Sequence, residues 1–205
     1  MTAVLFDCLL GNFNPDKIVE ELKGLGAISF PFLSENLRRL MADLARHLSY
    51  LPLKRNVSGG LVQQEADSCR TLSPYSLFSS FANEYEGFLS EQFYSLGSPV
   101  FAKPHRINDI SIQRYHKGSL GITPHIDGKS RLNLVSVIVL EGQGKFFICQ
   151  DRSGKDAVQL DGSPGNLILM RANGFMGYEN TPFHFVKDIE TDRYVFGLRQ
   201  KKPAI

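Results

Sequence analysis

DISIQRYHKGSLGITPHIDGKSRLNLVSVIVL, residues 109–140, opens a series of short β-rich segments that continues with GKFFICQ (144–150), AVQL (157–160), NLILMR (166–171), PFHFV (182–186) and RYVFGLRQ (193–200). Clusters of glycine, aspartate, asparagine and serine separate these segments, as is typical of polar turns between strands. Many short strands joined by such turns predict a β-sandwich or a β-barrel.

The residues before this series have a different pattern, which predicts helices. Asn14 can cap a first helix that runs to residue 24. Residues 27–32 read as an extended segment, and an aromatic-rich run over 75–96 has helical spacing with a core-facing stripe. Residues 34–49 predict an amphipathic helix whose apolar face is Leu37, Leu40, Met41, Leu44 and Leu48.

The order of the elements predicts the fold class. Helices come first and strands afterwards, without βαβ alternation, which favours an α+β fold with helices packed on one face of a mainly antiparallel double sheet. The chain has 205 residues, and we expect a single domain over 1–205, with a mainly helical support over 1–100 and a β core over 105–200. Residues 50–75 lack sustained periodicity and predict a loop or weak hairpin that could act as a lid.

Composition excludes several classes of protein. Lys and Arg number 23 against 21 Asp and Glu, so the net charge of +2 predicts no nucleic-acid partner. No stretch approaches the roughly 20 apolar residues of a membrane span. Cys8, Cys69 and Cys149 are odd in number and widely spaced, which disfavours a disulfide framework. We expect a soluble, untargeted protein of the cytoplasm, as a monomer or weak homodimer.

A candidate metal site lies in Thr-Pro-His125-Ile-Asp127, because residues two apart in an extended segment share a face. His184 follows 57 positions after Asp127, between apolar neighbours that suit a buried strand. Two histidines and one carboxylate form the facial triad of non-haem Fe(II) oxygenases. The alternative is a core histidine paired with a nearby aspartate. His47 and His105 are expected at the surface.

Two arginines favour the metal-site interpretation. Arg193 and Arg199 lie in a strand that is otherwise apolar enough to be buried. They share one parity, so both can face one cavity if the strand is regular. Buried guanidinium groups need anionic partners, and a dicarboxylate ligand would satisfy both.

With these motifs, residues 105–200 resemble the Fe(II)- and 2-oxoglutarate-dependent dioxygenases, and within them the AlkB-like group. The resemblance has three parts, in the family's order. They are Gln113-Arg-Tyr115, similar to the family's Asn-x-Tyr; His125-x-Asp127 with His184; and Arg193-Tyr-x-x-x-x-Arg199-Gln, similar to the C-terminal strand of the AlkB-like group.

The resemblance implies a double-stranded β-helix (jelly-roll, cupin-like) core that binds Fe(II) at the triad, with the triad as the catalytic centre. It also implies 2-oxoglutarate and O2 as cosubstrates, hydroxylation of a substrate, and release of succinate and CO2. Arg193, nine residues after His184, is expected to clamp the distal carboxylate of 2-oxoglutarate, and Tyr115 to donate its hydroxyl to the same group. Arg199 is expected nearer the metal, where it balances the 1-carboxylate of 2-oxoglutarate, with Gln113 assisting in cosubstrate binding.

The chain also departs from the AlkB-like pattern. Gln113 and Val195 stand where that group has asparagines, and Arg131, four residues past Asp127, stands where repair enzymes can carry an acidic residue that reads the base. These differences and the absence of Trp disfavour nucleic-acid repair. Lys129 and Arg131 are expected at the cavity mouth, in contact with a small, anionic substrate.

Two other functions stay open at this point. One is an AlkB-like oxidative demethylase of nucleic acid or protein, with residues 50–75 as a recognition lid. The other is a non-catalytic, cupin-like protein that binds a metal or ligand. Arg193 and Arg199 count against the last, because a simple metal-binding barrel does not need them.

Overall fold

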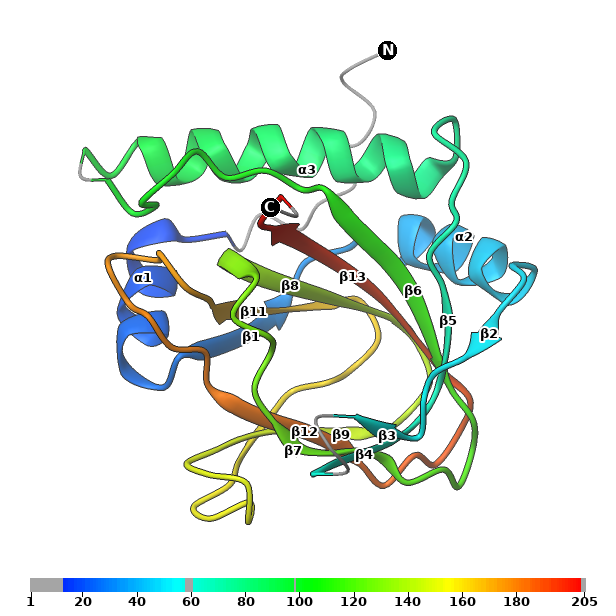
Figure 1. Cartoon of the computed structure of the whole chain (residues 1–205). Helices are drawn as coiled ribbons and strands as arrows, with labels where there is room; N and C mark the ends of the chain where they lie inside the picture. Colours follow the sequence, from blue (N-terminus) through cyan, green and yellow to red (C-terminus); the bar gives the residue numbers. More distant parts are fainter. Residues whose placement is uncertain (1–12, 58–60, 98, 204–205) are drawn as a thin grey trace.

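The computed structural model describes residues 13–57, 61–97 and 99–203, in which two antiparallel sheets lie beneath a layer of helices (Figure 1). The helices are α1 (Pro15–Gly24), α2 (Glu35–Arg46) and α3 (Leu77–Tyr94). The strands are β1 (Ala27–Pro31), β2 (Leu51–Pro52), β3 (Asn56–Val57), β4 (Val62–Glu65), β5 (Asp67–Cys69), β6 (Asp109–Tyr115), β7 (Gly121–His125), β8 (Arg131–Glu141), β9 (Lys145–Cys149), β10 (Val158–Leu160), β11 (Asn166–Arg171), β12 (Phe183–Lys187) and β13 (Arg193–Lys201).

The two sheets face each other, and this arrangement creates the interior in which the site lies. The larger sheet has the strand order β1-β11-β8-β13-β6-β5-β2, and the smaller one β10-β9-β12-β7-β4-β3. The helices lie on the outer face of the larger sheet (Figure 1). The predicted α+β class, with helices on one face of an antiparallel double sheet, is confirmed.

The helices begin where side-chain caps can satisfy the first free backbone amides. Asn14 accepts a hydrogen bond from the amide of Lys17, and Ser34 and Ser76 accept from the amides of the residues three positions on. The helices predicted over 14–24, 34–49 and 75–96 are therefore confirmed. No helix in the described ranges is long and apolar enough to cross a membrane.

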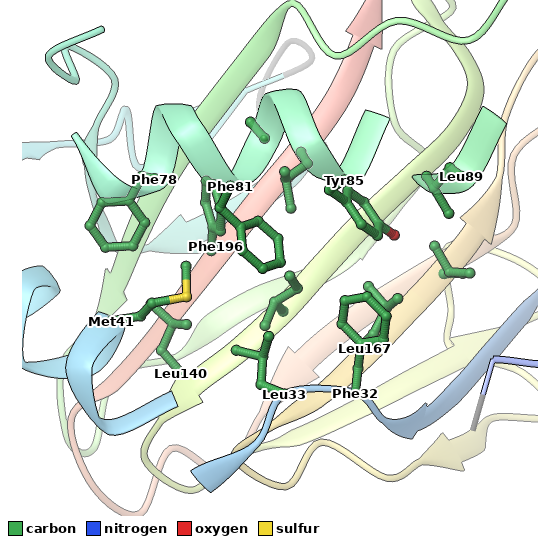
Figure 2. Close-up of a cluster of buried hydrophobic side chains, with 14 of the residues drawn as sticks. Phe32, Leu33, Met41, Phe78, Phe81, Tyr85, Leu89, Leu140, Leu167 and Phe196 are labelled. Carbon is green, nitrogen blue, oxygen red and sulfur yellow. The ribbon is translucent and has the colours of Figure 1, made fainter. Parts of the chain in front are cut away.

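Helix α3 supplies the aromatic half of the outer core. Figure 2 shows Phe78, Phe81 and Tyr85 pointing from α3 toward the larger sheet, where Phe196 of β13 meets them. The Phe78 and Phe196 rings pack edge to face with centroids 5.2 Å apart. The buried hydroxyl of Tyr85 donates to Ser136 Oγ at 3.1 Å, so no polar group of this ring is left unpaired. The predicted core-facing stripe is confirmed.

Helix α2 packs through a face rotated from the predicted one. Met41 is buried together with Ala42 and Ala45, whereas Leu40 is 51% exposed and Leu44 39% exposed. The two alanines allow the helix backbone to approach β8, and this close approach turns the larger leucines outward. The prediction of a single leucine face was therefore wrong for Leu40 and Leu44.

Residues 50–75, expected as a loop or weak hairpin, extend both sheets. β4 pairs with β7 of the smaller sheet, and β5 pairs with β6 of the larger one. β3 and β4 also pair with each other, so the expected weak hairpin is present, and the segment adds a wall to the interior. Residues 58–60 of the expected lid, and Cys8, lie outside the described residues, and lid movement stays a prediction.

Candidate metal centre

The predicted triad comes together where the two strands of the smaller sheet pair. His184 of β12 lies directly opposite His125 of β7, and their ring centroids are 4.2 Å apart. Asp127 follows two residues after the end of β7, and one ligand atom from each of the three side chains lies within 4.8 Å of the other two. A set of two imidazoles and one carboxylate at this spacing could hold one divalent ion.

Backbone carbonyls orient both imidazoles toward that ion site. The Nδ1–H of His125 donates to the carbonyl of Thr123 at 3.0 Å, and the Nδ1–H of His184 donates to the carbonyl of Pro182 at 3.1 Å. Because a carbonyl can only accept, each hydrogen bond places the proton of the neutral ring on Nδ1, and Nε2 is then the atom available as a ligand.

The protonation states also suit a metal. Burial and, to a smaller extent, the neighbouring His184 together lower the pKa of His125 to about 3. Burial alone would raise the pKa of Asp127, but its electrostatic interactions with His184 and Arg199 bring it below its usual value. Near neutral pH the site therefore offers a neutral imidazole and a carboxylate, the forms that bind metal.

A cavity of about 280 Å³ surrounds the triad between the two sheets. Its walls include apolar side chains from β8, β9, β11 and β13. Its polar lining, apart from the triad, is Gln64, Arg70, Gln113, Tyr115, Arg131, Arg193 and Arg199.

Arg193 is buried in this cavity and forms no ion pair with any described residue. The residue is 1% exposed, and its Nε and Nη2 have no hydrogen-bond partner among the described residues. It lies opposite Tyr115 of β6, and burial lowers its pKa to about 10. A Cβ on Gly144 would come within 3.0 Å of Arg193 Cδ, so this glycine makes room for the side chain. A buried guanidinium with free donors is the environment expected for a bound carboxylate.

Arg199 lies on the same face of β13 but belongs to the triad's side of the cavity. It is 8% exposed, its Nη1 donates to Ser111 Oγ at 3.1 Å, and its Nε has no partner among the described residues. Its charge acts on the carboxylate of Asp127. The predicted common face of Arg193 and Arg199 is therefore observed.

The two cosubstrate residues predicted on β6 line the cavity as well. Tyr115 is 5% exposed, and its pKa is raised by burial against the opposing effect of the Arg193 charge. The tyrosine thus stays a protonated hydrogen-bond donor at neutral pH. Gln113 lies opposite Val195, between the two arginines of β13.

The two predicted substrate residues separate in the structure. Arg131 lines the cavity and is hydrogen-bonded to Asp109. Lys129, expected at the cavity mouth, lies instead in a separate surface depression with Lys201 and Lys202. The turn after Asp127 carries Lys129 away from the site before β8 returns Arg131 to it.

Sequence reasoning missed Arg70, which also lines the cavity and whose Nη1 donates to Asp109 at 3.2 Å. It follows β5 in a segment without periodicity, so the sequence carried no signal for its position. His105, expected at the surface, is 4% exposed and stacks on Phe101 with ring centroids 5.1 Å apart. The expectation for His105 was wrong because its ring packs inward against Phe101.

The sequence matches no family model and no curated protein. Solved structures are similar to it over most of its length. A 2OG-Fe(II) oxygenase family oxidoreductase from Burkholderia pseudomallei matches with a TM-score of 0.65 and 14% identity, over 92% of this chain and 91% of that one. A prolyl-4-hydroxylase from Pseudomonas putida matches with a TM-score of 0.61 and 12% identity, over 92% and 99%. OsALKBH1 matches with a TM-score of 0.59 and 13% identity, over 85% and 98%.

At these identities the comparisons establish the fold. The chain has the double-stranded β-helix fold of the 2-oxoglutarate- and Fe(II)-dependent oxygenases, as its resemblance to this superfamily implied.

Proposed function

We propose that this protein is an Fe(II)- and 2-oxoglutarate-dependent oxygenase that hydroxylates a small-molecule substrate and releases succinate and CO2. The observation that carries the proposal is a His-Asp-His triad in the same cavity as a fully buried arginine with free donors. A metal-binding protein without turnover would have no use for Arg193 in that position.

The residues of the cavity fit the metal and the cosubstrate. His125, Asp127 and His184 would hold Fe(II), and Arg193 with Tyr115 would hold the distal carboxylate of 2-oxoglutarate. Bound iron with 2-oxoglutarate would supply the O2-dependent oxidation of a substrate C–H bond.

The protein's own part is to position the reactants and to exclude water. Arg193 and Tyr115 fix one end of the cosubstrate by hydrogen bonds, and a planar guanidinium matches a carboxylate in two places. Arg199 places a positive charge on the triad's side, next to Asp127, and Gln113 is a further donor between the two arginines. Apolar walls, among them Val135 and Met170, keep the interior dry.

Cavity size and surface charge support a small substrate. The cavity of about 280 Å³ is near the lower limit of ligand pockets, which span roughly 300–1,000 Å³. A net charge of +2 provides little attraction for a phosphate backbone. Buried Cys69 and Cys149 are free thiols, and the proposal places the protein in the reducing cytoplasm, as a monomer or weak homodimer.

The proposal is tested by binding and by turnover. The Mn(II)-loaded protein should bind N-oxalylglycine, a non-reactive analogue of 2-oxoglutarate, with a rise in Tm. With Fe(II), 2-oxoglutarate and O2 it should form succinate slowly without substrate, and Arg193→Met should remove both signals while Lys129→Gln keeps them. Failure of the wild type to bind the analogue would overturn the proposal. Formaldehyde release from a methylated oligonucleotide would make the protein a demethylase instead.

A further inference from the structure

The cavity has a second group of cationic side chains that the cosubstrate clamp does not use. Arg70, Arg131 and Arg199 surround the carboxylate of Asp109, and we call these four residues the arginine cluster. Arg70 and Arg131 hydrogen-bond to the two different oxygens of Asp109, and Arg199 lies opposite Asp109 across β6 and β13. All three arginines line the cavity.

The arginine cluster and the clamp are separate in space. Arg193 and Arg199 are six residues apart on β13, which corresponds to about 20 Å along an extended strand. The charges that act on Arg199 are those of Asp127 and of the other members of the cluster. Tyr115 lies directly opposite Arg193 at the other end of the strand pair, where Arg193 is the larger of the two arginine influences on its pKa and Arg199 the smaller. The triad thus lies in a cavity with a cationic group at each end.

The charges of the cavity do not balance even with metal and cosubstrate present. Its lining together with Asp109 carries four guanidinium groups, against the carboxylates of Asp127 and Asp109. A divalent ion and the dianion of 2-oxoglutarate cancel each other, so two positive charges remain. Buried or half-buried positive charge in excess is costly unless an anion meets it.

The arginine cluster also has free donors. Arg70, Arg131 and Arg199 each donate one side-chain hydrogen bond to a described residue, in each case from Nη1, although a guanidinium has five N–H groups. The Nε of Arg199 is buried and has no partner among the described residues. Asp109 holds the other two guanidinium groups in place, which leaves their remaining donors organised for a ligand.

We propose, on the basis of the proposed function, that the arginine cluster is the subsite that binds a carboxylate or phosphate group of the small-molecule substrate. The substrate is then an anion fixed at one end of the cavity, with a carbon atom over the triad, while Arg193 holds the cosubstrate at the other end. Arg131 is the main contact, because its side chain is only 16% exposed, and Arg70, 50% exposed, borders the entrance.

The test fills the metal and cosubstrate sites first. Protein saturated with Mn(II) and N-oxalylglycine is titrated with propionate, with inorganic phosphate and with the neutral isostere propanamide, at constant ionic strength. Calorimetry and Tm are the readouts. We expect one or both anions to bind and propanamide not to bind. Arg131→Gln should weaken anion binding at least tenfold, and Arg70→Gln should weaken it less. The matched control is Lys129→Gln, because Lys129 is exposed and lies outside the cavity. This variant should bind both anions as the wild type does.

The outcomes separate this proposal from the proposed function. Propionate binding alone assigns a carboxylate substrate, and phosphate binding alone assigns a phosphate ester. If N-oxalylglycine binds but neither anion does, or if Arg131→Gln binds the anions as the wild type does, the subsite is overturned and the oxygenase stands. If N-oxalylglycine fails to bind while the anions still depend on Arg131, the proposed function fails and the anion subsite stands. Displacement of propionate by single-stranded DNA at low concentration would reassign the cluster to a nucleic acid and overturn the small-molecule substrate.

Discussion

The guanidinium of Arg199 lies folded back over Gly197, two residues earlier on the same strand. A Cβ at position 197 would be 2.6 Å from Nη1 of Arg199 and 2.9 Å from its Cζ, closer than atoms can approach. Gly197 therefore lets the long side chain lie flat on the sheet, where its Nη1 reaches Ser111. The missing side chain of Gly197 thus determines where the guanidinium of Arg199 lies.

Gly197→Ala should displace Arg199 without unfolding the protein. The atoms that collide belong to the end of a flexible side chain, so the guanidinium can move. The move removes its hydrogen bond to Ser111, and we expect a loss of about 1 kcal/mol in stability and several-fold weaker binding of propionate. Urea unfolding and calorimetry measure the two effects.

Gly87→Ala provides the control for that substitution. Gly87 is an exposed residue inside α3, and a Cβ there meets nothing within 4 Å. We expect a gain of about 0.5–1 kcal/mol from helix propensity and unchanged ligand binding. Unchanged propionate binding in Gly197→Ala would show that Arg199 does not depend on the glycine.

Arg193→Met should separate stability from binding. The free protein keeps an arginine buried with two nitrogens unpaired, so an apolar side chain of similar length is expected to leave stability unchanged or raise it by about 1–2 kcal/mol. The same change should weaken N-oxalylglycine binding at least a hundredfold, because a charge-assisted pair is lost.

Arg199→Ala should raise the KM for 2-oxoglutarate much less than Arg193→Ala does. The reverse order would exchange the roles of the two arginines.

The part of the fold that sequence predicts best is the part set by local chemistry. Asn14 and Ser34 cap helices by hydrogen bonds to amides three residues away, and such signals are visible without any tertiary contact. The alternation of β13 likewise predicts that Arg193 and Arg199 share a face, because strand geometry alone requires it.

The features that sequence did not predict depend on partners far along the chain. β2 and β5 have two and three residues, and they are strands only because β6 offers an edge to β5. Arg70 reaches the cavity through a bond to Asp109, 39 residues away, and no local pattern reports such a contact. The exposure of Leu40 depends on how closely helix α2 approaches β8, and this approach is set by Ala42 and Ala45. A contact with a strand so far along the chain is not visible in the local pattern of α2.

His105 should make the protein less stable in acid. Burial lowers its pKa to about 4, from an ordinary value of about 6.5. Between these values the unfolded chain binds a proton that the folded protein does not, so stability falls as pH falls from 6.5 to 4. The residue's own contribution is up to about 3 kcal/mol over that range.

Urea unfolding of the wild type and His105→Gln at pH 7, 6, 5 and 4.5 measures that contribution. We expect a shallower loss of stability with falling pH in the variant, whatever its stability at pH 7. His125, whose pKa is also lowered by burial, is present in both proteins and cancels in the comparison. Equal slopes in the two proteins would show that the pKa of His105 is the same in the folded and unfolded chains.

Asp127→Asn tests the triad by its effect on metal binding rather than on activity. The wild type should rise in Tm with Mn(II) or Co(II), because the three ligand atoms are brought within 4.8 Å of one another only in the folded chain. The amide keeps the shape of the side chain but removes the charge, so the metal-dependent rise should fall by more than half. The matched control is Asp151→Asn, which should keep the full rise. The carboxylate of Asp151 accepts hydrogen bonds from Ser153 in a turn outside the cavity. A full rise in Asp127→Asn together with a full rise in His184→Ala would place the metal elsewhere in the protein.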